Sequence, residues 1–386
     1  MATLLLVFIY VIYIGLGIPD SVTGAAFPAL FKDFDLPVGY GSIITSLISV
    51  FTVIASVSSA KLINRFGTGI VTAFSTLLTA IALIGDAFAP SFWWLVVCTV
   101  PTGLGAGAID AALNNYVALN YKPSQLNFLH CFYGIGVALS PYLFSFALKN
   151  DDWRLGYRLV FYVQATITLL SFISLLVWKR IKKEGAENSF SPQTLKYSEM
   201  AKNPAIRISW LVFFSTCALE FTCDHWGATY LVKGSGADID VAATFLSLYF
   251  IGVTAGRFLS GLVAGKLQAE KVVFIGYSLI LAAIVILLLP LSATVKGIAL
   301  FIIGLGNGPT FPNLTYLTPV YFGKEVSQSV ISSQMAVANV GILVIPAIFG
   351  LIAQSTSVKI FPFYLAALFV IMVLSTVLYF KRAKRL

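Results

Sequence analysis

The chain has 386 residues, of which 58% are hydrophobic and only 11% are charged. A soluble domain carries about 25% charged residues, so a chain of this length and composition could not cover a water-facing surface. These values exclude a soluble enzyme, a disordered protein and a nucleic-acid-binding protein. We expect a polytopic membrane protein without a nucleic-acid partner, whose net charge of +9 comes from Lys and Arg in cytoplasmic loops.

Twelve apolar stretches are long enough to span a bilayer, which takes about 20 residues of helix. They are continuously apolar, which excludes a strand-based barrel. The first stretch has no basic segment before it and no cleavage site after it, which favours a spanning helix over a signal peptide. The expected spans are residues 4–31, 38–62, 68–89, 91–119, 124–148, 157–178, 205–232, 239–264, 271–291, 295–322, 326–353 and 358–380.

A polar interruption divides the spans into six and six. We expect an N-terminal six-helix bundle at residues 1–178, a cytoplasmic linker at 179–204 and a C-terminal six-helix bundle at 205–386. With both termini in the cytoplasm, 18 of the 25 Lys and Arg residues lie on that side, Arg257 among them. The excess of basic residues therefore predicts this orientation. The expected location is the plasma (inner) membrane, with several crossings and direct contact with membrane lipids.

The two halves carry related motifs about 200 residues apart. The pattern Gly-Leu-Gly-x-Gly at residues 103–107 returns at 304–308, which is 201 positions later. Internal symmetry of this kind marks many secondary transporters. The other correspondences are Arg65 with Lys266, Ser124-Gln125 with Ser327-Gln328, Gly136 with Gly341, and Pro141 with Pro346.

This arrangement resembles the major facilitator superfamily over the whole chain. Two six-helix halves joined by a basic loop are typical of that family. Residues 64–67, Asn-Arg-Phe-Gly, are similar to its loop motif between spans 2 and 3, with Asn64 in place of the acidic residue. The resemblance implies an all-α membrane protein with the major facilitator fold, in which twelve transmembrane helices form two pseudo-symmetric six-helix bundles. It also implies a secondary active transporter that works by alternating access.

Four acidic side chains lie well inside the predicted spans, where an ionisable group costs at least about 2.5–3.5 kcal/mol and marks a candidate functional site. The other acids, Asp86 included, lie near span ends or in loops, where a solvated charge is expected. Asn114 follows Asp110, one of these four acids, by a single helical turn and lies on the same face of the helix. We expect these acids to line an aqueous cavity. For Glu220 and Asp224, a polar clamp between helices is the alternative. The four are Asp20, Asp110, Glu220 and Asp224.

Amides, aromatic rings and two histidines in the spans complete the expected substrate site. A sugar needs donors and acceptors around each hydroxyl and an aromatic ring against its C–H face. Trp226 is expected to stack on the substrate, and the sequence leaves open a structural or a titrating role for His130. The candidate substrate-binding residues are Asp20, Asn114, Asn115, His130, Tyr133, Glu220, Asp224, His225, Trp226, Asn307, Asn313, Gln334 and Asn339.

Within the superfamily, the pattern is similar to the fucose permease group, which comprises fucose–galactose–glucose:proton symporters and sodium-dependent glucose transporter-like proteins. The similarity rests on Asp20, on Asp110 and on the Leu-His-x-x-aromatic-Gly-x-Gly pattern at residues 129–136. It implies proton-coupled symport of a sugar or a similar small polyhydroxylated solute, with Asp110 and Asp20 as the proton-coupling residues. The expected coupling ion is H⁺, and Na⁺ is the alternative.

Other functions stay open at this point. Acids in a cavity also suit a multidrug or organic-cation:proton antiporter of the same fold, although Pro141 is not followed by the glycine pair usual in such exporters. A non-transporting sensor or assembly protein would not need four buried acids. No nucleophile–base pair, phosphate-binding loop or metal-binding cysteine spacing appears, so we expect neither an enzyme nor a bound cofactor or metal. We expect a monomer.

Overall fold

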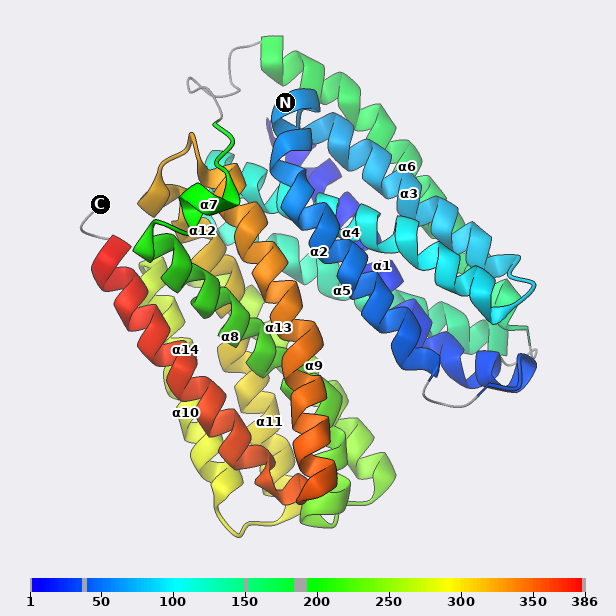
Figure 1. Ribbon diagram of the computed structural model, residues 1–386, viewed down its shortest axis with the longest axis vertical. Helices are drawn as coiled ribbons and strands as arrows, with labels where there is room; N and C mark the ends of the chain where they lie inside the picture. The colour runs from blue at the N-terminus through cyan, green and yellow to red at the C-terminus, as the bar shows by residue number, and fades with distance from the viewer. Residues whose placement is uncertain (1, 37–39, 149–151, 184–192, 384–386) are drawn as a thin grey trace. The chain divides into compact units, whose positions relative to one another are not determined.

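The computed structural model describes residues 2–36, 40–148, 152–183 and 193–383, and within these ranges the chain is helical with no β-strand (Figure 1). The first half contains α1 (Ala2–Asp33), α2 (Tyr40–Phe66), α3 (Thr68–Ala87), α4 (Phe92–Asn120), α5 (Pro123–Leu148) and α6 (Trp153–Lys183). The rest contains the short α7 (Tyr197–Met200), α8 (Pro204–Thr229) continued by the π-helix η1 (Tyr230–Gly234), α9 (Ile239–Val263), α10 (Ala269–Leu288), α11 (Ala293–Asn307), α12 (Thr310–Phe322), α13 (Ser327–Ser355), the 3₁₀ turn η2 (Val358–Ile360) and α14 (Phe361–Ala383).

Eleven helical segments of the described chain are long and apolar enough to cross a membrane. They match eleven of the twelve predicted spans to within a few residues at each end. The prediction of one unbroken helix at residues 295–322 is wrong, because this span consists of two short helices, α11 and α12. Gly308 and Pro309 separate them, and proline has no N–H group to continue the helical hydrogen bonds.

The helices form two compact units. The first unit comprises Met1–Tyr116 and Leu129–Thr194, and the second comprises Val117–Phe128 and Leu195–Leu386. The division after Thr194 falls inside the predicted linker. The end of α4 and the start of α5 group with the second unit, which the sequence did not indicate.

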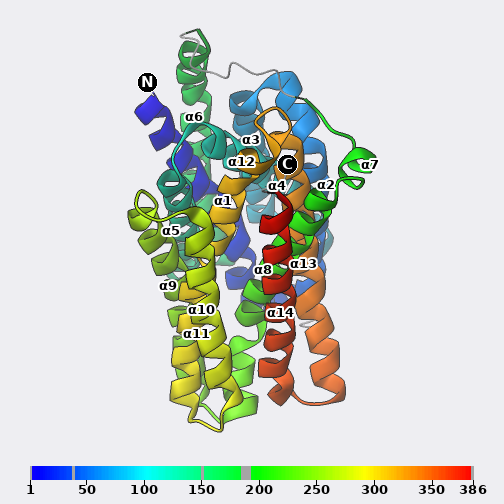
Figure 2. The ribbon, with the colours of Figure 1, turned by 90° about the vertical axis from the view of Figure 1, so that its left-hand side faces the viewer.

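Each unit is a bundle of long helices packed side by side. In the first unit, α6 packs along α3 and α1. In the second unit, α8 packs against α13 and α14, and α11 packs against α9 and α10, as the second view shows (Figure 2). Apart from α10 and α11, these neighbours are not consecutive in the chain, so each bundle depends on packing between helices that are distant in sequence.

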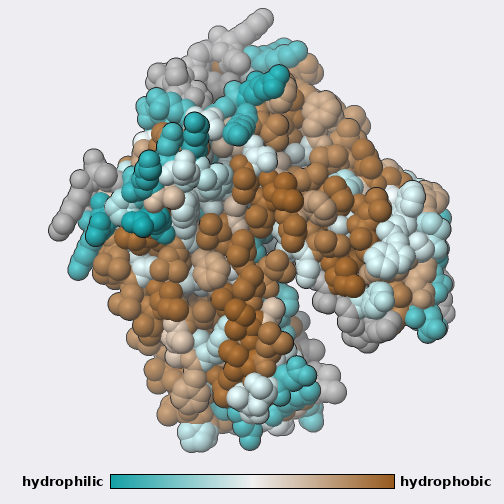
Figure 3. All heavy atoms as spheres, in the orientation of Figure 1, coloured by the Kyte–Doolittle hydropathy of each residue, from teal (hydrophilic) through white to brown (hydrophobic). Residues whose placement is uncertain are grey.

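The outer surfaces of the helices are apolar. Large side chains such as Trp93, Leu351 and Phe363 are exposed on them. Figure 3 shows hydrophobic residues along the flanks of the helices and hydrophilic residues gathered toward their ends, including the end near the C-terminus. Such a surface suits lipid, in which a helix satisfies its own backbone groups. The chain termini at residues 1 and 384–386 and the linker residues 184–192 lie outside the described residues.

The repeated glycines make the same contact in both units. Gly103 of α4 lies so close to the Ile48 carbonyl of α2 that a Cβ atom would overlap it. Gly304 of α11 lies in the same way against the Tyr249 carbonyl of α9, and both partners are 201 positions further along the chain. Small residues let membrane helices approach closely. Equivalent pairs are Gly105 at Ser75 and Gly306 at Gly276, and Gly107 at Thr52 and Gly308 at Val253.

A further close crossing joins α1 and α5 in the first unit. A Cβ atom at Gly17 would overlap the Tyr133 carbonyl, and one at Gly136 would overlap the Ile14 carbonyl. The two backbones therefore touch, and this contact places Tyr133 beside α1.

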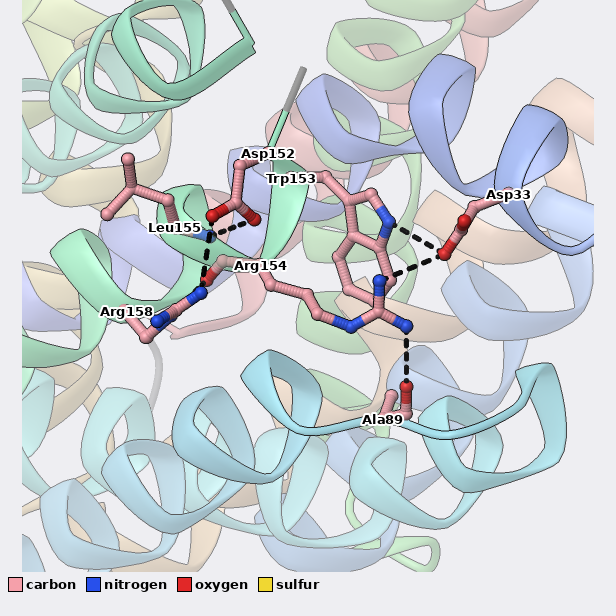
Figure 4. A network of polar contacts seen from close by, with 7 residues as sticks. All are labelled: Asp33, Ala89, Asp152, Trp153, Arg154, Leu155 and Arg158. Carbon is pink, nitrogen blue, oxygen red and sulfur yellow. Dashed lines mark hydrogen bonds and ion pairs between the residues drawn. The ribbon is translucent and has the colours of Figure 1, made fainter. Parts of the chain in front are cut away.

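The end of α1 is tied to the start of α6 (Figure 4). The Asp33 carboxylate accepts hydrogen bonds from the Trp153 indole and from Arg154, each at 3.0 Å. Arg154 also donates to the Ala89 carbonyl between α3 and α4, at 3.2 Å, and its guanidinium lies 4.1 Å from the Trp153 ring centroid. One cation therefore holds the ends of three helical segments together.

Replacing Gly17 with Ala should destabilise the first unit. The added methyl group pushes α1 away from α5, and overpacking of this kind costs about 1–3 kcal/mol. Gly24→Ala on the same helix is the matched control, because no atom lies within 4 Å of its added methyl group. In detergent, the thermal unfolding midpoint should fall for Gly17→Ala and stay unchanged for Gly24→Ala. Equal midpoints would contradict the close crossing.

Candidate functional site

Asp110 of α4 is the centre of a hydrogen-bond network in the first unit. Its Oδ1 accepts from the Tyr13 hydroxyl of α1 at 2.7 Å and from the Asn114 amide at 2.8 Å. The same amide nitrogen donates to the Tyr13 oxygen at 2.6 Å. Tyr13 and Asn114 are fully buried, whereas Asp110 is half-buried. Neutral donors thus surround the carboxylate from two helices.

His130 of α5 joins this network through Asn114. Its Nε2 lies 3.1 Å from Asn114 Oδ1. Because the Asn114 amide nitrogen donates to Asp110, the amide oxygen is the acceptor and His130 carries a proton on Nε2. The His130 ring also meets the Tyr13 ring edge to face, with centroids 5.4 Å apart. The histidine is therefore connected to Asp110 by one amide group.

Asp20 of α1 pairs with Tyr133 of α5. The Tyr133 hydroxyl donates to Asp20 Oδ2 at 2.6 Å. Asp20 is exposed, and Tyr133 is half-buried. The Tyr133 and Tyr13 rings meet edge to face at 6.4 Å, which connects the Asp20 pair with the Asp110 network. Asn115, another predicted residue, is buried in α4.

Tyr13 contacts the central carboxylate but is not among the predicted site residues. The chain has 17 tyrosines, so the residue type alone does not single it out. Tyr13 precedes Gly17 by four residues and Asp20 by seven, which places all three on one face of α1. That spacing is the signal that could have identified it.

Glu220 of α8 is paired with a buried cation in the second unit. Arg257 of α9 donates to Glu220 Oε1 at 3.2 Å, and Asn307 of α11 donates to Oε2 at 3.0 Å. The side chains of Glu220 and Arg257 are only 15% and 9% exposed. Arg257 also donates to the Gly308 carbonyl at 3.4 Å. This geometry is that of a polar clamp across three helices, in which the charge of Glu220 is cancelled.

Arg257 lies inside α9 and is buried, so it does not belong with the loop cations that support the predicted orientation. The predicted orientation does not change, because 17 of the 25 basic residues remain on that side. A carboxylate at the depth of Glu220 requires a countercharge, and Arg257 is a cation within the adjacent predicted span. A basic residue inside a predicted span is thus as informative as an acidic one.

Asp224 and His225 lie one turn beyond Glu220 and are more open. Their side chains are 29% and 53% exposed. His225 Nδ1 lies 3.7 Å from Asp224 Oδ2, but its short hydrogen bond, at 2.8 Å, is to the Phe221 carbonyl. These two side chains can therefore interact with a further polar group.

Trp226 packs α8 against α13. Its indole N–H donates to the Pro346 carbonyl at 2.9 Å, and its ring meets Phe349 edge to face. Gly350 leaves space for the same ring. The expected stacking of Trp226 on a substrate stays a prediction.

The remaining predicted amides bond within the second unit. They connect helices or hold a neighbouring turn, and their role as substrate ligands stays a prediction. The buried Oδ1 atoms of Asn307 and Asn313 have no hydrogen-bond partner among the residues that the structure describes. The bonds are Gln334 with Thr318 and Ser209, Asn313 with Ser260 and the Pro309 carbonyl, and Asn339 with the Met335 carbonyl. Among the described residues, no group of three or more His, Cys, Asp or Glu could hold a metal ion.

Comparison with known proteins gives matches over most of the chain. Residues 9–346 match the sequence model of the Major Facilitator Superfamily. The chain is 23% identical to "Bypass of stop codon protein 6" of Saccharomyces cerevisiae, with 91% of this chain and 77% of that protein covered. It is 22% identical to the glucose/mannose transporter GlcP of Bacillus subtilis, with 88% and 86% covered.

Solved structures share the fold. The fucose:proton symporter FucP of E. coli superposes with a TM-score of 0.75 at 14% identity, covering 96% of this chain and 98% of that one. The proton:xylose symporter XylE superposes with a TM-score of 0.78 at 12% identity, covering 98% and 94%. The predicted all-α transporter fold is confirmed. The matched family and both structures are of transporters, which also confirms that the chain is not an enzyme.

Breaking the Glu220–Arg257 pair should destabilise the second unit strongly. Arg257→Met leaves a buried carboxylate without its cation, which costs about 3–5 kcal/mol. The double variant Glu220→Gln/Arg257→Met leaves no charge and should recover much of this loss.

The control is Arg158→Met, which breaks an ion pair whose side chains are 39% and 41% exposed and should change stability by about 0–1 kcal/mol. Thermal unfolding in detergent measures all three variants. If Arg257→Met unfolds at the same temperature as Arg158→Met, the Glu220–Arg257 pair does not have this role.

Proposed function

Because the chain belongs to the major facilitator superfamily, we propose that this transporter carries a sugar or a similar small polyhydroxylated solute in symport with protons. The Asp110 network is the observation that carries the proposal. The names of its relatives support it, since they include a glucose/mannose transporter, a fucose:proton symporter and a proton:xylose symporter.

A coupling carboxylate has to gain and lose a mobile cation during each cycle. Within the described chain, Asp110 forms no ion pair, unlike Glu220 with Arg257. Neutralising Asp110 therefore takes a mobile ion, and a proton is the simplest one. Its donors Tyr13 and Asn114 come from two helices, so a movement of α1 against α4 changes the hydrogen bonds that favour the charged form.

Asp20 and Tyr133 are the proposed substrate contacts in the first unit. A carboxylate accepts hydrogen bonds from sugar hydroxyls, and an aromatic ring packs against the apolar face of a sugar. Asp20 is exposed and its position is fixed by the 2.6 Å bond from Tyr133. In the second unit, the half-buried side chain of Asp224 and the exposed side chain of His225 are the proposed contacts.

Organic-cation antiport is the competing function. That function favours uncompensated negative charge around the substrate. Arg257 cancels the charge of Glu220, which removes one of the four acids that a cationic drug would use. This difference favours a neutral substrate.

The proposed location is the plasma (inner) membrane, with both termini in the cytoplasm. The proposed oligomeric state is a monomer. The basic residues support this orientation even without Arg257.

A binding screen should separate the two substrate classes. Purified protein in detergent is mixed with glucose, mannose, galactose, fucose or xylose and, separately, with cationic dyes, and unfolding midpoints are recorded. At least one sugar should stabilise the protein, and Asp20→Asn should weaken its binding about tenfold or more, as expected for a lost hydrogen bond to a charged group. Stabilisation by dyes without any response to sugars would favour the antiporter.

Asp110→Asn should separate coupling from binding. The amide has the shape of the protonated acid but cannot release a proton. In vesicles, the variant should lose sugar accumulation driven by a pH gradient and retain exchange of labelled for unlabelled sugar, because exchange requires no deprotonation. Accumulation by Asp110→Asn under a proton gradient alone would exclude Asp110 as the coupling residue.

A further inference from the structure

Asp86 of the first unit lies in the wall of a small cavity, apart from the Asp110 network. Asp86, in the last turn of α3, lines this cavity with Thr99 and Thr102 of α4 and Tyr157 of α6. Apolar side chains of α1 and α2 contribute to the wall, and Pro19 is one of them. The volume is about 10 Å³, which is room for about one water molecule or small ion.

Asp86 has no fixed countercharge. In the part of the chain that the structure describes, no lysine, arginine or histidine forms an ion pair with it. Its hydrogen-bonding neighbour is the thiol of Cys98, which is a weak donor. Asp86 therefore lies in the cavity wall and not at the solvated helix end that the sequence predicted. A carboxylate without an ion pair at this position needs a mobile ion to neutralise it.

The hydroxyl groups of Thr99 and Thr102, two residues that line the cavity, use their hydrogen atoms within α4. Thr99 donates its hydroxyl hydrogen to the Val96 carbonyl at 2.7 Å, and Thr102 donates to the Cys98 carbonyl at 2.8 Å. The lone pairs of both oxygens remain for another partner. The lining therefore contains a carboxylate, a phenol and two hydroxyl groups, which are oxygen groups of the kind that hard cations prefer. The C-terminal end of α3 adds partial negative charge.

We propose that this cavity binds a small monovalent cation, Na⁺ in particular, with Asp86 as the charged ligand. Thr99 and Thr102 supply neutral oxygens. One carboxylate balances one positive charge, and the small volume excludes an organic cation. A proton alone requires a single oxygen and gives the two threonine acceptors no role.

The bound ion also touches the helix that carries Asp20. Pro19 lines the cavity and precedes Asp20 directly in α1. Occupancy of the cavity therefore fixes α1 beside the proposed substrate contact and should strengthen sugar binding. This consequence rests on the proposed function, whereas the ion site itself does not.

Equilibrium binding of ²²Na⁺ to the purified full-length protein tests the site, at constant ionic strength with choline chloride as the balancing salt. The wild type should bind Na⁺ saturably, and Asp86→Asn should lower its affinity at least tenfold. Thr102→Val, which removes one oxygen and keeps the shape, should lower it severalfold. The control variant is Asp238→Asn, which also removes one carboxylate but at an exposed position before α9. It should bind Na⁺ with the affinity of the wild type.

Two results would overturn the inference. One is a wild type that binds no Na⁺ above the choline background, in which case a proton neutralises Asp86. The other is unchanged affinity in the folded Asp86→Asn or Thr102→Val variant. Asp110→Asn should retain Na⁺ binding, so a failure of proton coupling there can be told apart from a failure of this site. A wild type that binds Na⁺ but transports no sugar would refute the proposed function alone.

Discussion

Every acidic side chain inside a bilayer has to be neutralised, and the partner that does so decides what the residue can do. Glu220 has a fixed cation in Arg257, and the pair holds helices together. Within the described ranges, the hydrogen-bond donors of Asp110 are neutral, Tyr13 among them, and the residues that line the small cavity with Asp86 are neutral too. A fixed partner gives structure, whereas a carboxylate without one is available to an ion that moves.

The two units share a scaffold but differ in their chemistry. Glycines 201 positions apart bring equivalent helices into backbone contact, so both bundles are built by the same close crossings. The polar groups follow this symmetry only in part. Glu220 stands 200 positions after Asp20, but the residue 201 positions after Asp110 is Phe311. Among the described residues, Asp110 and Asp86 of the first unit form no ion pair, which suits ion coupling, whereas Glu220 of the second unit is in a buried one.

Hydropathy predicted the helices because it depends on each stretch of sequence alone, and it placed most helix ends within a few residues. It missed the break at Gly308 and Pro309, since both residues occur inside apolar runs and only the geometry shows that the helix stops. The candidate acids could be selected because a charge in an apolar span is visible in one segment. Tyr13 and Arg257 also had a signal in their own spans, the spacing to Gly17 and Asp20 and a cation within an apolar stretch, but their partners lie on other helices. The cavity at Asp86 could not be predicted, because its lining comes from several helices.

Proton uptake on sugar binding is the most direct test of the claim that Asp110 is the carboxylate neutralised by the mobile ion. Purified protein in weakly buffered solution is mixed with the sugar that binds best, and the change in pH is followed with an indicator. The wild type and the Glu220→Gln variant should take up protons in proportion to the bound sugar, and Asp110→Asn should bind sugar without proton uptake. Equal proton uptake by Asp110→Asn and the wild type would contradict this account.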